Sequence, residues 1–411
     1  MPKVMHINCA CAGSTGKIIG DIADYAVNKG FQTLLCAPCA PGNNPNIRYV
    51  RTSFPYEQGL YRRLNRFYGF QYGFAPISTI RIKHAIKKEK PDLVHIHCVN
   101  GFMVNVYALV RLLKENHIPT VITNHAEFFY TGSCAYAGDC ERWKSGCGDC
   151  PQGAAATMCK VKDTTAAAWK KMKETWQDAE NTVMVSVSPW VGGRAIQSPL
   201  VANLPQRVIF NGVNTEIFTC YETAVLRKEM NIGETTKVIF HPTANFSADP
   251  ADRKGGKYIL ELAKQFENEN VVFLVAGKYS QDLKVPQNVM LLGRIADQKL
   301  LAKYYAMADV TVIASSRETF SMPVAESLCC GTPVVGFFAG GPESIAIEKF
   351  SKFSEYADVL SLAENIRQML SKSADKEEIS VCAKETYAAS RMAQEYLQIY
   401  EQLLRKEGND S

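Results

Sequence analysis

Long hydrophobic runs are absent from this sequence of 411 residues. No apolar stretch approaches the ~20 residues of a membrane-spanning helix, so we do not expect an integral membrane protein. The segment Met1–Asn8 also lacks the basic region and the long apolar stretch of a secretory signal peptide. These absences predict a soluble protein of the cytoplasm.

A large excess of one charge sign is also missing. The chain has 46 Lys and Arg against 41 Asp and Glu, which gives a formal net charge of +5. This mild balance does not by itself indicate nucleic-acid binding, and we expect no nucleic-acid partner. Hydrophobic residues make up 46% of the chain and charged residues 21%, as in an ordinary globular protein with a buried core. At ~150 residues per domain, the length predicts two or three domains.

The first half of the chain alternates short apolar strands with amphipathic helices. Strands are predicted at residues 3–8, 92–98, 119–125 and 182–188, and helices at residues 13–28, 80–90, 103–116 and 164–178. Apolar strands without polar alternation are typical of a parallel sheet that is covered on both faces. The pattern therefore predicts an α/β, doubly wound unit.

A second series of the same kind begins near Arg207. Its strands are predicted at residues 208–210, 237–241, 271–277, 288–293, 309–315 and 333–337, and its helices at residues 256–267, 297–308 and 323–330. A final helical stretch from about Lys384 is expected to return to the first unit. We expect a first domain at residues 1–205 with 384–411, and a second at 206–383. Ligands bind beyond the carboxyl ends of strands in such sheets, so two facing units predict a cleft between them.

Two glutamates flank the segment ETFSMPVAE at residues 318–326. Pro323 suits the first turn of a helix, and Glu326 lies about one turn into it. The free backbone amides at the start of such a helix are a natural seat for a diphosphate. Glu318 and Glu326 would then hold sugar hydroxyls on one side and ribose hydroxyls on the other. Taken alone, the spacing favours a helix-capping glutamate beside a solvated one.

A glycine-rich turn, AGSTGK, connects the first predicted strand to the first helix. The small residues Gly13, Ser14 and Gly16 allow the backbone to approach a phosphate or a sugar. The spacing is not that of a P-loop, and alone it predicts only a tight turn. His125 follows another buried strand at its carboxyl end, where a ligand site is expected, although a core histidine is an equal alternative.

Cysteine is unusually frequent, with 14 residues in a chain expected to lie in a reducing compartment. Four of them share one short loop that ends in a Cys-x2-Cys pattern: Cys134, Cys140, Cys147 and Cys150. Four thiolates in one loop fit a tetrahedral structural zinc site, which supports folding rather than catalysis. Free thiols, an iron–sulfur cluster and disulfides are the alternatives, and Cys159 is a substitute ligand.

Basic and aromatic side chains alternate over residues 61–90. They are Arg62, Arg63, Arg66, Arg81, Lys83, Lys87 and Lys88, with Phe67, Tyr68, Phe70, Tyr72 and Phe74. Such a stretch fits peripheral contact with anionic lipid at the inner face of a membrane, beside a polyprenyl-linked acceptor. A solvated helix face over a packed loop is the alternative.

These segments, in their order along the chain, resemble retaining glycosyltransferases of the GT-B fold, and glycosyltransferase family four (group 1 type) in particular. Residues 318–326 are similar to the family's Glu-x7-Glu signature, and GTPVVGFFAGGPE at 331–343 is similar to its Gly-Gly loop. VIFNGVNTEIF at 208–218 resembles the family's entry to its second domain. SVSPWVGGRAIQSPL, PDLVHIHCVNG and ITNHAEFFYTGSC resemble segments of its first domain. The cysteine-rich loop indicates a subgroup.

The resemblance implies roles in binding the donor. Glu318 would contact hydroxyls of the donor sugar, and Glu326 the nucleotide ribose. The backbone near Ser321, Met322, Pro323 and Val324 would hold the diphosphate, although Pro323 has no amide hydrogen.

The resemblance also implies a cation at the leaving group. Lys254 matches the family lysine that neutralises the departing phosphates, which gain negative charge in the transition state. The family's partnering arginine is missing from HPTANFSADPAD, and Arg253 is its expected substitute. Gly13, Ser14 and Gly16 would lie near the diphosphate. His125 would contact the donor sugar, with Glu127 replacing the aspartate that usually follows.

The fold that the resemblance implies is GT-B: two facing Rossmann-like domains with a cleft between them and a C-terminal helix that returns to the first. The implied reaction transfers a sugar from a UDP- or GDP-sugar to a glycan or polyprenyl-linked acceptor, with retention and without a catalytic metal. The expected product is a surface polysaccharide or a lipid-linked oligosaccharide. A sugar-nucleotide epimerase or phosphorylase of similar fold, and a catalytically idle zinc-containing scaffold, are the alternatives.

Overall fold

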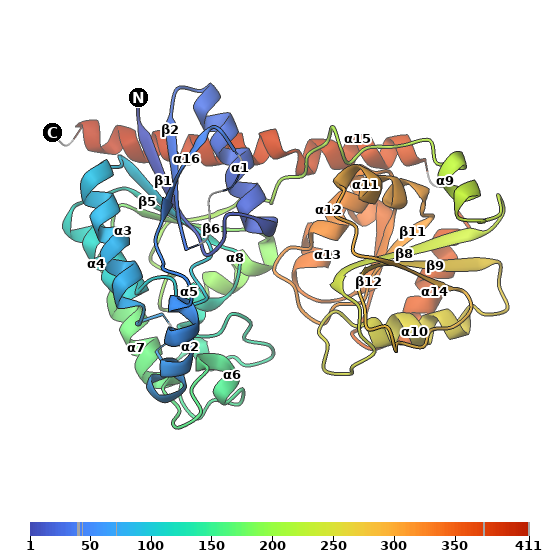
Figure 1. Cartoon of the computed structure of the whole chain (residues 1–411), viewed down its shortest axis with the longest axis horizontal. Coiled ribbons are helices and arrows are strands. Elements are labelled where there is room, and N and C mark those ends of the chain that lie inside the picture. The colour runs from blue at the N-terminus through green and yellow to red at the C-terminus, as the bar shows by residue number, and fades with distance from the viewer. Residues whose placement is uncertain (39–41, 43, 71, 373–374, 410–411) are drawn as a thin grey trace. The chain divides into compact units, whose positions relative to one another are not determined.

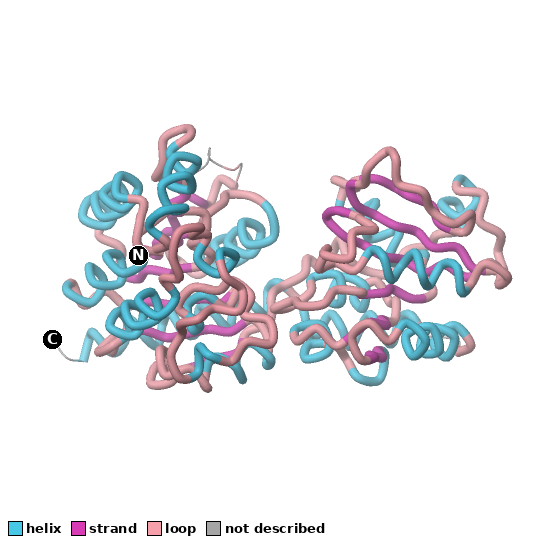
Figure 2. Tube along the Cα trace, turned by 90° about the horizontal axis from the view of Figure 1, so that it is seen from below, coloured by secondary structure: helices cyan, strands magenta, loops and turns pink. Residues whose placement is uncertain are grey.

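The computed structural model describes residues 1–38, 42, 44–70, 72–372 and 375–409. The chain divides into two compact units. The first unit comprises Met1–Phe210 and Met392–Ser411, and the second comprises Asn211–Arg391. Each unit is a sheet with helices on both faces, as Figures 1 and 2 show.

The first unit is built on a seven-stranded parallel sheet in the order β3-β2-β1-β4-β5-β6-β7. The strands are β1 (Lys3–Ile7), β2 (Gln32–Ala37), β3 (Ile47–Arg51), β4 (Leu93–Ile96), β5 (Thr120–Asn124), β6 (Thr182–Ser186) and β7 (Gln206–Val208). Every residue of the central strands β4 and β5 is buried. This explains their uninterrupted apolar character, because a parallel sheet with helices on both faces has no solvent side.

Helices of the first unit connect these strands. They are α1 (Gly13–Asn28), α2 (Glu57–Tyr68), α3 (Pro76–Glu89), α4 (Val106–Glu115), α5 (Phe128–Thr131), α6 (Ala154–Thr157), α7 (Thr165–Trp176) and α8 (Pro189–Ala195), with a 3-10 turn at Arg142–Lys144. The cysteine-rich loop lies between α5 and α6.

The C-terminal helix α16 (Ala389–Asn409) packs on the first unit. Its apolar face, including Met392, Tyr396 and Tyr400, joins Ile18 and Ile22 of α1 in one buried cluster. The expected return of the C-terminus is therefore confirmed. The expected single helix from Lys384 is two helices, because α15 (Lys376–Tyr387) ends at Ala388, whose ψ of 134° is not helical. Residues 410 and 411 lie outside the described part of the chain.

The second unit contains a six-stranded parallel sheet in the order β10-β9-β8-β11-β12-β13. The strands are β8 (Lys237–Asn245), β9 (Val271–Lys278), β10 (Val289–Gly293), β11 (Val310–Ile313), β12 (Val334–Phe337) and β13 (Ser351–Ser354). The helices are α9 (Ala224–Glu229), α10 (Gly256–Gln265), α11 (Gln298–Met307), α12 (Met322–Cys329), α13 (Gly341–Ile345), α14 (Val359–Leu370) and α15, with a 3-10 turn at Glu348–Phe350.

One strand falls in a different sheet from the one expected. The strand predicted at residues 208–210 was assigned to the second series. The structure places it at Gln206–Val208 as β7, paired with β6 in the first sheet. The α/β, doubly wound class is confirmed, with two parallel Rossmann-like sheets.

Each sheet changes winding direction at one pair of strands. In the first sheet, β1 lies between β2 and β4; in the second, β8 lies between β9 and β11. The connections from β1 and β8 run to one side of the sheet, and those after β4 and β11 run to the other. Such a reversal opens a crevice at the carboxyl ends of the two strands, where α/β sheets bind their ligands. A ligand site is therefore expected at the ends of β1 and β4, and another at the ends of β8 and β11.

Candidate functional site

A pocket of about 560 Å³ opens in the second unit at the ends of β8 and β11. The charged and hydroxyl-bearing side chains that line it include Lys254, Lys278, Arg294, Tyr305, Glu318 and Glu326. Met322 and Pro323, at the start of α12, also line it. The reversal point of the second sheet therefore holds a concave site with both positive and negative side chains.

Glu318 and Lys254 form an ion pair in this pocket. Lys254 Nζ lies 2.9 Å from Glu318 Oε1, and Ser315 Oγ donates a hydrogen bond of 2.6 Å to the same oxygen. The Glu318 side chain is 13% exposed and that of Lys254 is 44% exposed. The lysine ammonium is therefore fixed beside the carboxylate and remains open to a ligand.

The glycines after Lys254 explain how its turn is held. Gly255 has a φ of +72°, and a Cβ there would lie 2.0 Å from the carbonyl oxygen of Ala314. Ser316 N also donates to the Arg253 carbonyl oxygen over 2.9 Å. A side chain at position 255 would force this turn away from the end of β11, and Lys254 would move with it.

The amino end of α12 forms one wall of the pocket. Ser321 precedes the helix with a φ of +85°, and its side chain makes no capping hydrogen bond. The backbone N–H groups of a first helical turn have no partner within the helix, and they carry the positive end of its dipole. The side chains of Ser321 and Val324 are buried away from the pocket, so any contact from them to a ligand there would come from the backbone.

The Gly-Gly loop fixes the chain that precedes α12. Glu318 N donates to the Ala339 carbonyl oxygen over 3.0 Å, and Gly341 N donates to the Glu318 carbonyl oxygen over 2.8 Å. A Cβ on Gly341 would lie 2.5 Å from the Phe320 nitrogen, so only glycine permits this approach.

Glu326 is held by a residue that the sequence analysis did not single out. Tyr305 of α11 donates a hydrogen bond of 3.0 Å from its hydroxyl to Glu326 Oε2. Burial, and then the charge of Glu326, raises the pKa of Tyr305 well above its ordinary value. The hydroxyl therefore keeps its proton, and it orients the carboxylate.

The position of the second cation stays a prediction. The Arg253 side chain is exposed and is not among the residues that line the pocket, whereas Lys278 and Arg294 are. Lys278 is the last residue of β9, and Arg294 directly follows β10. A basic residue at the carboxyl end of a parallel strand was the signal that could have found them.

The reversal point of the first sheet carries the glycine-rich turn. Gly13 begins α1 with a φ of +80°, Ser14 is exposed in its first turn, and a Cβ on Gly16 would lie 2.7 Å from the Cys11 carbonyl oxygen. Asn8, which the sequence analysis missed, is fully buried and donates to the Ala10 carbonyl oxygen over 2.7 Å. Its side-chain oxygen accepts a hydrogen bond of 3.1 Å from the backbone of Cys98, so it ties the turn to the end of β4.

His125 follows β5, one strand further along the sheet. Burial lowers its pKa to about 4, so the ring is neutral near pH 7. His97 Nδ1 lies 3.3 Å from His125 Nε2. The predicted site residues thus fall into two groups. Lys254, Glu318, Glu326 and the start of α12 lie in the second unit. Gly13, Ser14, Gly16 and His125 lie at the carboxyl ends of strands in the first unit.

Glu127 does not face a ligand, which corrects the expectation that it replaces an aspartate. Its side chain is fully buried and lies 2.7 Å from Arg194 Nε. It also accepts hydrogen bonds from the Tyr130 hydroxyl, over 2.9 Å, and from the backbone nitrogen of Ala137. Glu127 therefore anchors the cysteine-rich loop to α5 and α8.

The four thiols of the cysteine-rich loop lie near one another, because burial and then the charges of Cys150, Cys147 and Cys140 raise the pKa of Cys134 to about 12. In the described part of the chain, three or more candidate metal ligands have their ligand atoms within 4.8 Å of one another at one place. That group is His6, His95 and His97, and it includes no cysteine. Trp143 also holds the loop, because it is buried, donates to the Cys140 carbonyl oxygen and accepts from Trp169. The zinc site stays a prediction.

Comparison with known families agrees with this architecture. Residues 15–217 match the family model described as "Glycosyltransferase Family 4", and residues 231–386 match "Glycosyl transferases group 1". Together the two models match most of the chain. The fold is that of GT-B enzymes, and the chain belongs to the group 1, family four glycosyltransferases. It is accordingly a retaining hexosyltransferase that uses a nucleotide-sugar donor.

Curated relatives are distant. WcaC of Escherichia coli (strain K12), named for glycosyl transfer in colanic acid biosynthesis, is 22% identical over 324 residues, which are 76% of this chain and 77% of the relative. The N-acetyl-alpha-D-glucosaminyl L-malate synthase of Bacillus anthracis is 23% identical over 217 residues, 49% of this chain and 55% of that protein.

Solved structures share the fold over almost the whole chain. Sucrose-phosphate synthase from Thermosynechococcus elongatus has a TM-score of 0.74 at 17% identity, covering 99% of this chain and 100% of that one. HepE from Anabaena in complex with UDP has a TM-score of 0.68 at 14% identity, covering 98% and 100%. The subgroup expected from the cysteine-rich loop stays a prediction.

Proposed function

We propose that this enzyme transfers a hexose from a UDP- or GDP-sugar to a sugar or polyprenyl-linked oligosaccharide acceptor, in the synthesis of a surface polysaccharide. The observation that carries the proposal is the pocket of the second unit, where the Lys254–Glu318 pair and the start of α12 meet. The structures of HepE with UDP and with UDP-glucose favour a uridine donor, and the name of WcaC favours a polysaccharide product.

The chemistry follows from where negative charge develops. As the bond between the sugar's anomeric carbon and the phosphate oxygen breaks, the leaving diphosphate gains charge. Lys254 and the N–H groups at the start of α12 would stabilise that charge. The acceptor hydroxyl attacks from the same face, and its proton passes to the leaving phosphate oxygen, which gives retention. Because fixed cations serve the phosphates, we expect no catalytic metal.

The two carboxylates would divide the donor between them. Glu318, beside Lys254 at the end of β11, would accept hydrogen bonds from hydroxyls of the sugar. Glu326, held by Tyr305, would bind the ribose. We propose that the second unit binds the donor and that the first unit binds the acceptor. Gly13, Ser14, Gly16 and His125 would then lie near the diphosphate and the transferred sugar.

Glu326 provides the test. The variant Glu326→Ala removes the ribose contact and is expected to weaken binding of UDP-glucose or GDP-mannose, whichever wild type binds, by at least about tenfold, since a hydrogen bond to a charged group contributes roughly 1.5–3 kcal/mol. Titration calorimetry measures the affinity, and Glu364→Ala, which removes an exposed glutamate of α14, is the matched control. Unchanged donor binding in Glu326→Ala would show that the assigned site is wrong.

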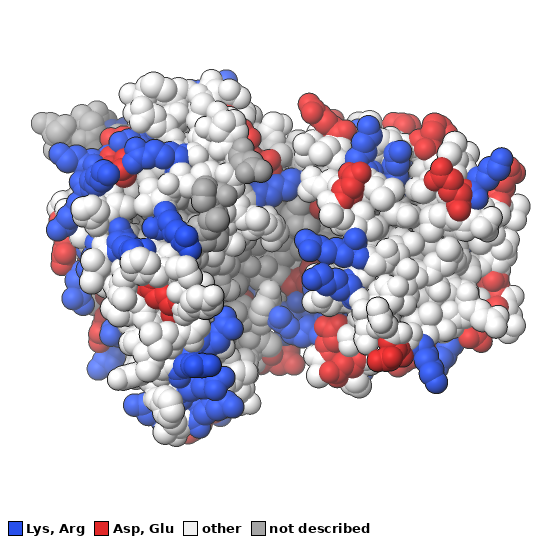
Figure 3. Space-filling model, in the orientation of Figure 1, with Lys and Arg blue, Asp and Glu red and all other residues white. Residues whose placement is uncertain are grey.

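A basic and apolar surface on the first unit fits a lipid-linked acceptor. Side chains of α2, α3 and the preceding loop are exposed although they are apolar: Phe54, Tyr56, Leu60, Phe67, Tyr68, Ile77 and Ile80. Figure 3 shows Lys and Arg gathered on this face of the first unit, among uncharged side chains. Both acidic residues of the segment 51–90, Glu57 and Glu89, are buried.

The surface therefore presents cations and large apolar groups without an exposed carboxylate among residues 51–90. Glu57 is used internally, because it accepts hydrogen bonds from Tyr61 and Ser78, each over 2.7 Å. A bilayer surface that carries anionic lipid attracts such a face through charge and takes up its aromatic rings. No helix of the described residues is both long and apolar enough to cross a bilayer, so we propose a peripheral contact.

Flotation with vesicles tests this contact. We expect binding to vesicles of phosphatidylglycerol and weak binding to vesicles of phosphatidylcholine. At ~1 kcal/mol for each basic residue near the surface, the double variant Arg62→Glu, Arg63→Glu should bind at least tenfold more weakly. Lys264→Glu with Lys299→Glu in the second unit makes the same change of charge and should bind as wild type. Equal loss in both double variants would refute a surface at α2.

A further inference from the structure

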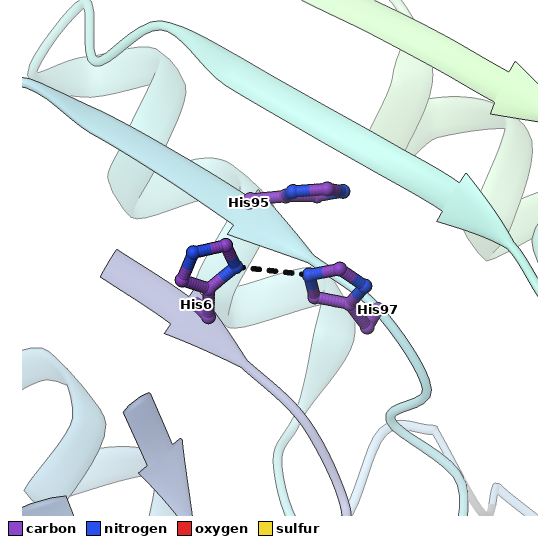
Figure 4. A group of neighbouring side chains, drawn as sticks. All are labelled: His6, His95 and His97. Atoms are coloured by element: carbon purple, nitrogen blue, oxygen red, sulfur yellow. Dashed lines mark hydrogen bonds between the residues drawn. The ribbon is translucent and has the colours of Figure 1, made fainter. Parts of the chain in front are cut away.

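A cluster of buried histidines lies next to His125. His6 is in β1, His95 is the register partner of His6 in β4, and His97 directly follows that strand. All three rings are fully buried, and Figure 4 shows them close together. Three imidazoles are costly to bury unless their nitrogens have partners, so the arrangement of those nitrogens is informative.

The nitrogens form a chain that ends at His125. His6 Nδ1 lies 3.0 Å from His97 Nε2, the contact drawn as a dashed line in Figure 4. His97 Nδ1 lies 3.3 Å from His125 Nε2. The ring planes of these neighbours differ by only 30° and 20°. Both nitrogens of His97 are therefore engaged by other imidazoles.

This cluster has the ligand spacing of a metal site but not its geometry. His95 Nδ1 is hydrogen-bonded to the Tyr400 hydroxyl over 2.6 Å, and its Nε2 to the Thr123 hydroxyl over 2.8 Å. The ring centroids of His95 and His97 are 3.7 Å apart, so the two rings pack against each other. A metal needs lone pairs that converge in the ring planes. The ring nitrogens of His95 are directed at hydroxyls, and those of His97 at two other histidines.

The rings stay neutral because they are buried. Desolvation lowers the pKa of His6 to about 3 and that of His125 to about 4, and it lowers the pKa values of His95 and His97 well below the ordinary range. A neutral imidazole has one N–H donor and one acceptor nitrogen. In a chain of such rings, each N–H points the same way, so one end of the chain decides the protonation of the other.

His6 decides the direction. Its Nε2 is buried and has no hydrogen-bond partner among the described residues. Buried N–H groups without a partner are rarer than unpaired acceptors, so this nitrogen carries the lone pair and Nδ1 carries the proton. His6 Nδ1–H then donates to His97 Nε2, and His97 Nδ1–H donates to His125 Nε2. The remaining proton of His125 must lie on its Nδ1.

We propose that His97 is a positioning residue that holds His125 in the tautomer protonated on Nδ1, with His6 setting the direction of the chain. His95 supports the arrangement from the side, because Tyr400 of α16 and Thr123 fix its ring against that of His97. The effect on catalysis rests on the proposed contact between His125 and the donor sugar. That contact would use Nδ1–H as a hydrogen-bond donor to a sugar oxygen.

Nitrogen-15 NMR of histidine-labelled protein tests the tautomer without any substrate. In wild type, we expect His125 to show a protonated Nδ1 and an unprotonated Nε2, with its signals identified through His125→Gln. His97→Leu should give a mixture of the two tautomers. His97→Gln should keep the wild-type pattern, because an amide also offers one donor and one acceptor. His84→Gln changes an exposed histidine of α3 and is the control.

Other outcomes overturn the proposal. A wild-type His125 protonated on Nε2 would reverse the chain, and an unchanged tautomer in His97→Leu would remove the role of His97. Stoichiometric metal in wild type that is lost in both His6→Leu and His97→Leu would show a metal site instead. Metal analysis of the same samples by mass spectrometry provides that measurement.

The kinetic consequence separates this inference from the proposed function. With UDP-glucose as donor, His97→Leu should lower kcat about tenfold to a hundredfold, the range for a lost, well-placed hydrogen bond, while His97→Gln recovers most of the loss. Affinity for UDP alone should not change in either variant. If the NMR pattern changes in His97→Leu while kcat does not, the sugar contact of His125 is wrong and the positioning by His97 stands. Loss of the donor site itself would appear in Glu326→Ala.

Discussion

The buried histidines of the first unit predict that this unit becomes unstable in mild acid. Four of them, His6, His95, His97 and His125, stay neutral in the folded state at pH values where an unfolded histidine, with a pKa of about 6.5, takes up a proton. Because these folded pKa values are lowered, the unfolded state binds more protons below pH 6.5. Stability is then lost as the pH falls.

The magnitude follows from the pKa values. For His6, with a folded pKa of about 3, lowering the pH from 7 to 5 costs about 2 kcal/mol. His125, with a folded pKa of about 4, gives nearly the same figure, and His95 and His97 act in the same direction. His6 and His125 together therefore cost about 4 kcal/mol by this linkage. Asp21 opposes them by about 1 kcal/mol, because burial raises its folded pKa to about 6.

Tryptophan fluorescence can follow the first unit by itself. All four tryptophans, Trp143, Trp169, Trp176 and Trp190, lie within Met1–Phe210. Urea unfolding curves at pH 7, 6 and 5 should show a loss of at least about 3 kcal/mol in the unfolding free energy, which is a large part of the ~5–15 kcal/mol of a typical domain. His84→Gln should show the same loss. A change of less than about 2 kcal/mol between pH 7 and 5 would refute the assignment of neutral buried histidines.

Two further predictions concern the loops. Gly255→Ala should reduce donor affinity at least about tenfold and destabilise the second unit by about 1–3 kcal/mol, because its Cβ would meet the Ala314 carbonyl oxygen at 2.0 Å. Calorimetry with UDP-glucose measures the affinity, and denaturant unfolding measures the stability. Gly293→Ala is the control that separates backbone strain from the clash, because Gly293 has a φ of +71° and no atom within 4 Å of its Cβ. For the cysteine-rich loop, the zinc hypothesis predicts stoichiometric zinc in purified protein, and its loss in Cys147→Ser together with much of the stability of the first unit. Metal analysis by mass spectrometry checks this, and wild-type protein without zinc and with freely reactive thiols would contradict it.

Most of the architecture could be predicted from the sequence because buried parallel strands are uniformly apolar. β1, β4, β5 and β8 were found in this way. β3 and β13 were missed because they are edge strands of mixed polarity, IRYVR and SKFS. Pairing with one neighbour defines such strands, and the sequence carries no periodic signal for it. β2 was also missed, although five of its six residues form a buried run that such a pattern can identify.

The site could be predicted only in part, for a related reason. Glu318, Glu326 and the start of α12 lie within one short segment, so sequence spacing describes them. Tyr305 enters from α11, and its contact with Glu326 depends on how two helices pack on one face of the sheet. The position of Glu127 after β5 predicts a contact with a ligand. Its ion-pair partner Arg194, however, lies 67 residues away along the chain, so the sequence does not reveal the pair.

The cations of the pocket bear on the arginine that the loop after β8 lacks. A bound nucleotide-sugar presents a diphosphate, and a single lysine paired with Glu318 leaves little net positive charge to hold it. His241 adds none, because its buried ring, bonded through Nδ1 to the Val312 carbonyl oxygen, has a pKa lowered to about 4. Lys278 and Arg294 line the same pocket from the ends of β9 and β10, so the lining side chains named here carry three cations against two carboxylates. The requirement is for positive charge at the phosphates and not for an arginine at one place in the sequence. A neighbouring strand can therefore supply the charge that the loop after β8 lacks.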